Sequence, residues 1–142
     1  SYCQKDIRRL RLAEVFLFTA PGTPCVFYGD ELGMDGDHEE TLRGPMPWDA
    51  PFHDEREFFR TLVTLRRENK ALIYGSYRAL FMDEDGLYIY RRQLKEHTVT
   101  IALNARNHTA KLEDMDPLTD PMMSDGFEAG RLAPFGYAVW TQ

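Results

Sequence analysis

The stretch PGTPCVFYGDELGMDG, residues 21–36, decides the fold of the N-terminal half of the chain. Pro, Gly and Pro stand within its first four residues, a short apolar run follows over residues 25–28, and Gly29, Asp30 and Glu31 end that run. A continuous apolar run between turn residues is typical of a fully buried parallel strand, because such a strand has no solvent-facing side. We therefore expect a buried strand over residues 23–28 that delivers these three residues to a fixed place.

Helical patterns lie on both sides of this run. Residues 5–18 begin charged and end apolar on nearly all sides, and Glu14 is the one polar member of an otherwise apolar row. A segment without either period follows over residues 29–53, and loops of that length inside compact domains are usually functional. Asp54, with Glu57 three residues on, predicts an N-cap and a helix that runs to about residue 69.

Beyond residue 75 the pattern changes to short β-rich runs separated by turn residues. The expected strands cover residues 76–81, 87–93, 98–104 and 136–140. In the third of these, Val99, Ile101 and Leu103 share one face. The runs predict a small antiparallel sandwich, with a domain boundary near Gly75. We expect two domains, residues 1–74 and 75–142.

The first of these domains is expected to be incomplete. One buried parallel strand needs parallel strands on both edges and helices on both faces, and we expect those partners to lie before Ser1. A helix, a strand, a long loop and a helix followed by a sandwich are what the end of a (β/α)₈ barrel with an appended sandwich would contain. The expected fold class is therefore an α/β remnant of a TIM barrel followed by an all-β antiparallel sandwich.

Composition excludes several classes of partner. The chain has 142 residues and a formal net charge of −6, which disfavours binding to nucleic acid or to an anionic membrane surface. It has no run of 18 apolar residues, so no membrane span is expected. Cys3 and Cys25 are too few for a disulfide framework, and we expect reduced thiols. The compartment remains open.

Two motifs carry a family resemblance. The first is a G-x-P-x-x-x-x-G-D-E block within FLFTAPGTPCVFYGDELGM, formed by Gly22, Pro24, Gly29, Asp30 and Glu31. The second, RGPMPWD, follows at residues 43–49. Together they resemble the alpha-amylase superfamily of glycoside hydrolases, most closely the cyclomaltodextrinase, neopullulanase and related bacterial amylase branches.

The resemblance implies a fold position and a chemistry. Residues 23–28 would form the eighth barrel strand, between the seventh and eighth barrel helices. Members of the family cleave α-glucosidic bonds with retention, using an Asp nucleophile, a Glu acid/base and a second Asp that all precede this strand. The chain is therefore expected to hold no catalytic residue, cofactor or metal, and to be inactive alone. Asp30 and Glu31 are not assigned as nucleophile and acid, because adjacent residues of a strand point to opposite faces.

The long loop is where the resemblance places retained function. Arg43 and Glu39, with Asp37 as the alternative acid, would hold glucose hydroxyls of an α-glucan or maltooligosaccharide; the other interpretation is a solvated acidic loop with Arg43 as counter-ion. Trp48 could stack on a sugar ring, but we favour a buried indole that plugs the loop. The acids at positions 35, 37 and 39 lack the Gly and distant Glu of an EF-hand calcium loop.

Two further expectations concern an alternative function and self-association. The alternative function is a non-catalytic carbohydrate-binding sandwich that presents tyrosines, although a same-face pair is more often packing. The candidate tyrosines are Tyr77, Tyr88, Tyr90 and Tyr137. A strand without its neighbours exposes apolar edges, so we also expect self-association through residues 10–30.

Overall fold

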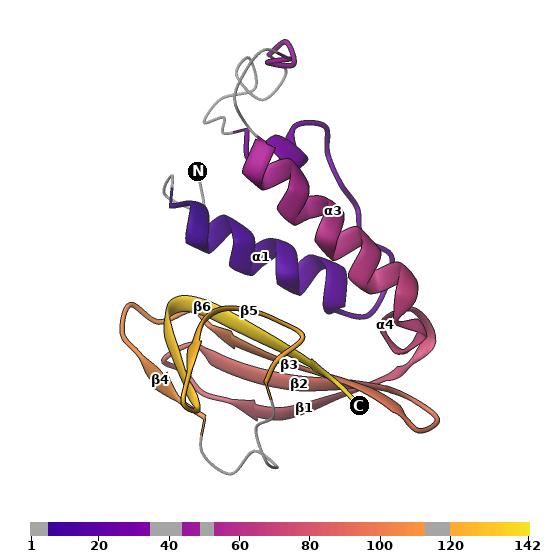
Figure 1. Cartoon of the computed structure of the whole chain (residues 1–142), viewed down its shortest axis with the longest axis vertical. Coiled ribbons are helices and arrows are strands. Elements are labelled where there is room, and N and C mark those ends of the chain that lie inside the picture. The colour runs from indigo at the N-terminus through magenta and orange to yellow at the C-terminus, as the bar shows by residue number, and fades with distance from the viewer. Residues whose placement is uncertain (1–5, 35–43, 49–52, 113–119) are drawn as a thin grey trace.

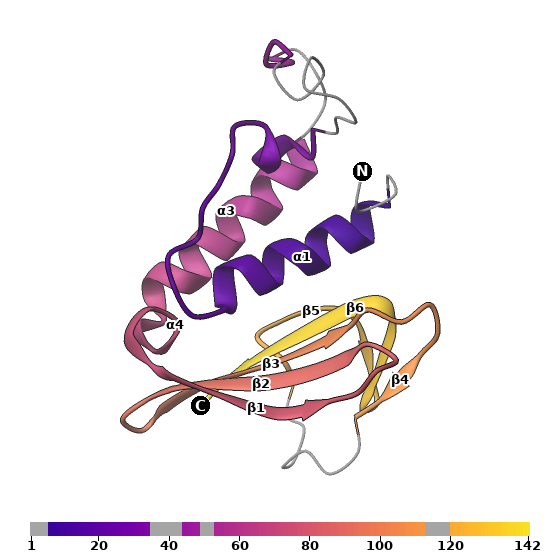
Figure 2. The same cartoon turned by 180° about the vertical axis from the view of Figure 1, so that it is seen from behind.

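The computed structural model describes residues 6–34, 44–48, 53–112 and 120–142. Helix α1 (Ile7–Thr19) lies across one face of an antiparallel sheet, and helix α3 (His53–Glu68) lies on the far side of α1 from the sheet (Figures 1 and 2). A single 3₁₀ turn, η1 (Asp30–Leu32), packs against α3, and the short helix α4 (Lys70–Tyr74) leads from α3 into the sheet. The molecule is thus layered as sheet, α1 and α3.

Helix α1 confirms the prediction for residues 5–18 to within two residues. The carboxylate of Asp6 caps it by accepting a hydrogen bond from the Arg8 backbone N–H at 3.0 Å. Leu12, Val15 and Phe18 are buried between the sheet and α3. The helix is therefore held on two sides, as its nearly all-round apolar end predicts.

Helix α3 begins at residue 53, two residues before the first helical position that an N-cap at Asp54 predicts. Asp54 lies in the first turn of the helix rather than at the N-cap. Its negative charge is favourable in the first turn because the helix N-terminus carries a partial positive charge. Leu62 and Leu65 are buried against α1, and the ring of Phe59 meets that of Phe18 edge to face, with centroids 5.0 Å apart. This apolar seam holds the two helices together.

The sheet is antiparallel throughout. Its strands are β1 (Ser76–Met82), β2 (Leu87–Leu94), β3 (His97–Asn104), β4 (Ala110–Lys111), β5 (Met123–Glu128) and β6 (Arg131–Thr141). The order is β1-β2-β3-β6-β4, and β5 also pairs with β6. The four predicted strands are confirmed; β4, β5 and the first half of β6 were not predicted.

The two faces of the sheet build two apolar clusters. Val99, Ile101 and Leu103 of β3 face the helices, as their alternation predicts. The intervening Ala102 faces the second cluster, which contains Ile89 and Trp140 among others. The described strands belong to one hydrogen-bonded sheet that curls around this second cluster, rather than to two separately paired sheets. The expectation of an antiparallel β-rich C-terminal half is confirmed.

The predicted strand over residues 23–28 is wrong. The structure has no strand there, and the side chains of Val26 and Phe27 are 42% and 55% exposed. A parallel strand requires partners on its edges, and among the described strands none pairs with this segment. The expected barrel remnant is not confirmed. In the described ranges, no helix is long and apolar enough to cross a membrane.

Candidate functional site

The candidate site is built on the connection from α1 to η1, residues 20–34, which we call the rim segment. A side chain of α3, Arg66, holds the beginning of the rim segment. Its guanidinium donates to the carbonyls of Phe18 at 2.8 Å and Ala20 at 3.2 Å, and also to that of Gly22. These carbonyls would otherwise be unsatisfied at the end of a helix. Arg66 therefore sets the direction in which the rim segment leaves α1.

A tight turn at residues 29–34 forms the other end of the rim segment. Gly29 has φ +90°, a conformation that favours glycine, and a Cβ there would stand 2.5 Å from the sulfur of Met34, whose side chain would have to shift. The carboxylate of Asp30 accepts from the Phe27 N–H at 2.8 Å, and that of Glu31 from the Gly29 N–H at 2.9 Å. Each carboxylate thus binds a backbone N–H that lies two or three residues before it in the chain.

The predicted sugar-contacting residues Arg43, Glu39 and Asp37 lie outside the described residues, so their roles stay predictions. The backbone next to Arg43 is described. The hydroxyl of Tyr28 donates to the Gly44 carbonyl at 3.3 Å, which holds the backbone at Gly44 beside the rim segment.

The prediction of a buried plug at Trp48 is wrong. Its side chain is 76% exposed, and its backbone N–H donates to the Met46 carbonyl at 3.0 Å in a short turn. An exposed indole offers an apolar face and a polar N–H to a ligand. The exposure fits the alternative interpretation of Trp48 as a sugar-stacking side chain.

A pocket of about 520 Å³ opens between α1, the rim segment and Phe59 of α3. Glu14 and Asp30 line it. Burial raises the pKa of Glu14 to about 8, and the charges of Glu55 and Asp30 act in the same direction. The sequence signal for this group was the single polar break in the apolar row of the helix; its environment could not be read from the pattern.

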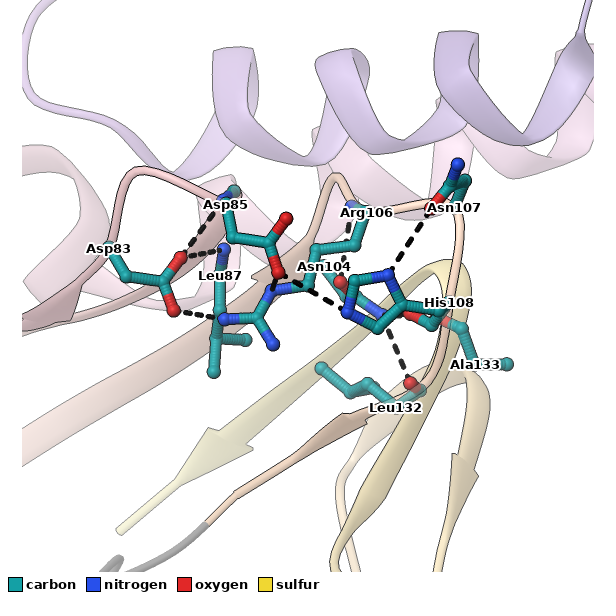
Figure 3. A network of polar contacts seen from close by, with 10 residues as sticks. Asp83, Asp85, Leu87, Asn104, Arg106, Asn107, His108, Leu132 and Ala133 are labelled. Atoms are coloured by element: carbon teal, nitrogen blue, oxygen red, sulfur yellow. Dashed lines mark hydrogen bonds and ion pairs between the residues drawn. The ribbon is translucent and has the colours of Figure 1, made fainter.

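A second polar cluster joins the β1–β2 turn to the loop after β3 (Figure 3). The Asp83 carboxylate accepts from the backbone N–H groups of Gly86 at 2.9 Å and Leu87 at 3.0 Å, and it pairs with Arg106. The backbone N–H groups, first of all that of Leu87, hold the pKa of Asp83 below its usual range. Asp85 pairs with Arg106 at 3.3 Å.

His108 and Asn104 complete this cluster. His108 Nε2 lies 3.2 Å from the Asp85 carboxylate, and the Asn104 amide donates to the carbonyls of Leu132 at 3.0 Å and Ala133 at 2.8 Å. Apart from Arg106 Nε, which has an ion pair but no hydrogen bond, these side chains are ion-paired or hydrogen-bonded to one another or to the backbone, which is the arrangement of a structural tie. Across the described ranges, no group of three or more His, Cys, Asp or Glu residues is placed to hold a metal ion.

The tyrosines of the alternative carbohydrate-binding function are mostly packed. Tyr90 and Tyr137 are buried, and the ring of Tyr88 packs against that of Tyr90 at a tilt, with ring centroids 5.0 Å apart. The ring of Phe16 on α1 meets that of Tyr90 edge to face at 6.1 Å. The same-face pair of β2 is therefore packing beneath α1, and of the four tyrosines only Tyr77 is exposed.

Comparison with known proteins bears on both halves of the chain. No family model matches it. It is 37% identical over 102 residues to a cyclomaltodextrinase of a Bacillus species, an alignment that covers 70% of this chain and 18% of that protein. It is 34% identical over 107 residues to neopullulanase 2 of Thermoactinomyces vulgaris, covering 73% of this chain and 18% of that protein.

A solved structure extends the similarity to nearly the whole chain. The alpha-amylase of Geobacillus thermoleovorans, complexed with acarbose, superposes with a TM-score of 0.77 at 28% identity, covering 95% of this chain and 33% of that one. The chain thus spans about a fifth of its curated relatives' length and a third of this structure. With these relatives, the chain belongs to the alpha-amylase family of glycoside hydrolases.

Proposed function

We propose that the chain forms part of the substrate-binding region of a retaining glycoside hydrolase that cleaves α-glucosidic bonds in starch-type glucans or maltooligosaccharides. The observation that carries the proposal is the turn at residues 29–34. It contains the Gly-Asp-Glu of the family motif, and glycine geometry and two carboxylate-to-backbone hydrogen bonds fix its shape. A turn built in this way can support a loop that touches a ligand.

The sugar contacts would come from the loop that this turn introduces. Arg43 and an acid at position 39 or 37 would hold glucose hydroxyls through charge-assisted hydrogen bonds. The hydrogen bond from Tyr28 to Gly44 supports this role, because it anchors the backbone that follows Arg43. The exposed indole of Trp48 would stack on a sugar ring.

We further propose that the catalytic carboxylates belong to a part of the parent enzyme outside this chain. Retaining cleavage needs two carboxyl groups about 5 to 5.5 Å apart across the scissile bond. Asp30 and Glu31 are each bound to backbone N–H groups of their own turn, and Glu55 is paired with Arg11 at 2.6 Å. These local roles support the proposal that the chain alone does not turn over substrate.

Assays on soluble starch, pullulan and a nitrophenyl α-maltoside test the catalytic part. We expect no turnover above buffer for the chain, and the same result for Glu31→Gln. A rate that survives repurification and disappears in Glu31→Gln would contradict the assignment of the catalytic groups to another part of the enzyme.

Binding is tested separately by tryptophan fluorescence during titration with maltoheptaose. The chain has two tryptophans, of which Trp140 is buried and Trp48 exposed, so a change on binding reports Trp48. We expect Trp48→Leu to remove the signal and Arg43→Lys to weaken binding, while Arg78→Lys on the exposed β1 has no effect. Amide shifts of the ¹⁵N-labelled chain on maltoheptaose that survive the first two changes and are lost in Tyr77→Ser would favour the carbohydrate-binding module instead.

A further inference from the structure

The pocket beside α1 has apolar walls and two acidic groups. Leu17, Pro24 and Phe59 form part of the walls, Glu14 and Asp30 are its acids, and none of the described residues that line it is a lysine, arginine or histidine. Its volume, about 520 Å³, is enough for one long side chain with room to spare. Among the described residues, the lining of the pocket is thus acidic and contains no basic side chain.

Glu14 is a buried carboxyl group for which the described residues supply no hydrogen-bond or ion-pair partner. Its side chain is only 7% exposed, and within residues 6–34, 44–48, 53–112 and 120–142 it forms no hydrogen bond or ion pair. Buried polar groups are nearly always hydrogen-bonded, and a buried carboxyl without a partner is costly. The neighbouring cation does not serve it, because Arg11 binds Glu55 through two hydrogen bonds of 2.6 and 3.1 Å.

We propose that this pocket binds the side chain of an arginine presented by another polypeptide. The aliphatic stem would lie along Leu17 and Pro24, and the guanidinium would reach the carboxylates of Glu14 and Asp30. Long cationic side chains bury their stems against apolar surface in this way, and a guanidinium bonds carboxylates through two parallel hydrogen bonds. The net charge of −6 favours approach of a basic segment.

Protonation of Glu14 couples this binding to pH. Burial, with Glu55 on α3 and Asp30 on η1, raises its pKa, while Arg11 on the same helix lowers it. At neutral pH much of the free pocket therefore holds the neutral acid, which cannot form an ion pair. A bound guanidinium favours the carboxylate, so binding should become tighter as pH rises from 6 to 9.

The experiment is a titration of the ¹⁵N-labelled chain with two acetylated, amidated tripeptides, Leu-Arg-Leu and Leu-citrulline-Leu. Citrulline has nearly the shape of arginine but no charge. We expect saturable amide shifts at Leu17, Ala20 and Asp30 with the arginine peptide. The citrulline peptide should bind at least about tenfold more weakly, because it lacks roughly one charge-assisted hydrogen-bonding contact.

Variants assign the effect to the pocket. Glu14→Gln should weaken the arginine peptide about tenfold and remove the pH dependence, whereas Glu68→Gln, an exposed acid of α3, should change neither. Glu14→Gln removes a buried charge and keeps the side-chain shape, so it should fold. Equal binding of the two peptides, or an unchanged Glu14→Gln titration, would overturn the proposal. Pocket shifts that depend on protein concentration without peptide would also overturn it, because a second copy would then occupy the site.

Discussion

The guanidinium of Arg92, on β2, donates a hydrogen bond of 2.9 Å to the carbonyl of Thr19, the last residue of α1. The same side chain donates to the carbonyls of Gly75 at 3.0 Å and Ser76 at 3.3 Å. Arg92 is only 2% exposed, so these three backbone groups have a buried cation as their shared donor. The contact joins the end of the first helix to the beginning of the sheet.

Arg92→Met should therefore uncouple the helices from the sheet. The methionine fills much of the space but leaves buried carbonyls without a donor, which costs about 2 to 4 kcal/mol in total. We expect one urea transition followed by circular dichroism in the unchanged chain, and two transitions or a much lower midpoint in the variant. Arg78→Met, on the exposed strand β1, should change the free energy of unfolding by no more than about 0.5 kcal/mol. Equal curves for the two variants would show that Arg92 does not couple the parts.

Glu14 should make the chain less stable as pH rises. The pKa of Glu14 is about 8 in the folded chain against an ordinary 4.5, so between these values the folded state binds more protons than the unfolded state. The free energy of unfolding then falls as pH increases through this window, by about 2 kcal/mol after allowance for solvent in the pocket. Urea unfolding at pH 5, 6.5 and 8 measures it. Glu14→Gln should flatten the dependence, Glu68→Gln should not, and a parallel slope in Glu14→Gln would refute the assignment.

Asp83 should make the chain less stable as pH falls, the opposite of the effect expected for Glu14. Its folded-state pKa is lowered by the Leu87 and Gly86 N–H groups and by Arg106, so its contribution to stability is present above the ordinary pKa of 3.8 and is lost as pH falls through the lower folded value. We expect Asp83→Asn to lower the melting temperature at pH 7 and to have little effect near about pH 2. Asp85→Asn is the matched control: its carboxylate is exposed, so its ion pairs of 3.2 and 3.3 Å should contribute little. Equal losses from both changes at pH 7 would contradict this account.

Sequence pattern predicted the elements whose cause is local. The alternation of Val99, Ile101 and Leu103 and the apolar end of α1 specify which faces are buried, and the structure confirms both. β5 and the first half of β6 escaped prediction because Gly126, Pro134 and Gly136 interrupt their pattern. Those strands depend on pairing with each other, a non-local contact that no short window contains.

The errors at residues 23–28 and at Trp48 have a common cause. Both predictions assumed neighbours that would bury these side chains, and in the described structure the neighbours are absent. The end of the apolar run at Gly29 was predicted because glycine followed by two acids is a local signal. The raised pKa of Glu14 was not predicted, because it depends on burial and on Glu55 and Asp30, which other elements place near it.

Exposed apolar side chains of the rim segment should promote weak self-association. Val26 and Phe27 lie side by side in sequence and are both largely exposed, and they do not line the acidic pocket. Exposed apolar patches of this kind tend to pair in solution. Sedimentation velocity at micromolar concentration, with reductant because Cys25 is an exposed thiol, should show a concentration-dependent dimer. Phe27→Ser should shift it toward monomer while Phe81→Ser on β1 does not; a clean monomer at every concentration would refute the prediction.

Gly22 and Gly29 offer a matched test of what shapes the rim segment. Both have positive φ, +99° and +90°, so alanine strains the backbone at either position by about 1 kcal/mol. They differ in space: a Cβ at Gly22 meets nothing within 4 Å, whereas at Gly29 it would stand 2.5 Å from the sulfur and 3.1 Å from the Cβ of Met34. The sulfur lies at the end of a flexible side chain and can move, but the Met34 Cβ must also give way, so Gly29→Ala should cost about 1 kcal/mol more than Gly22→Ala.

The difference should appear first in the turn itself. The Met34 amide donates to the Gly29 carbonyl at 3.0 Å, so its hydrogen exchange reports whether the turn is closed. We expect strong loss of protection at Met34 in Gly29→Ala, little loss in Gly22→Ala, and partial recovery in Gly29→Ala combined with Met34→Ala, which removes the crowding sulfur but keeps the strained φ. If the two glycine variants lose protection equally, backbone strain alone shapes the turn, and the close approach of Met34 has no part in holding Asp30 and Glu31 in place.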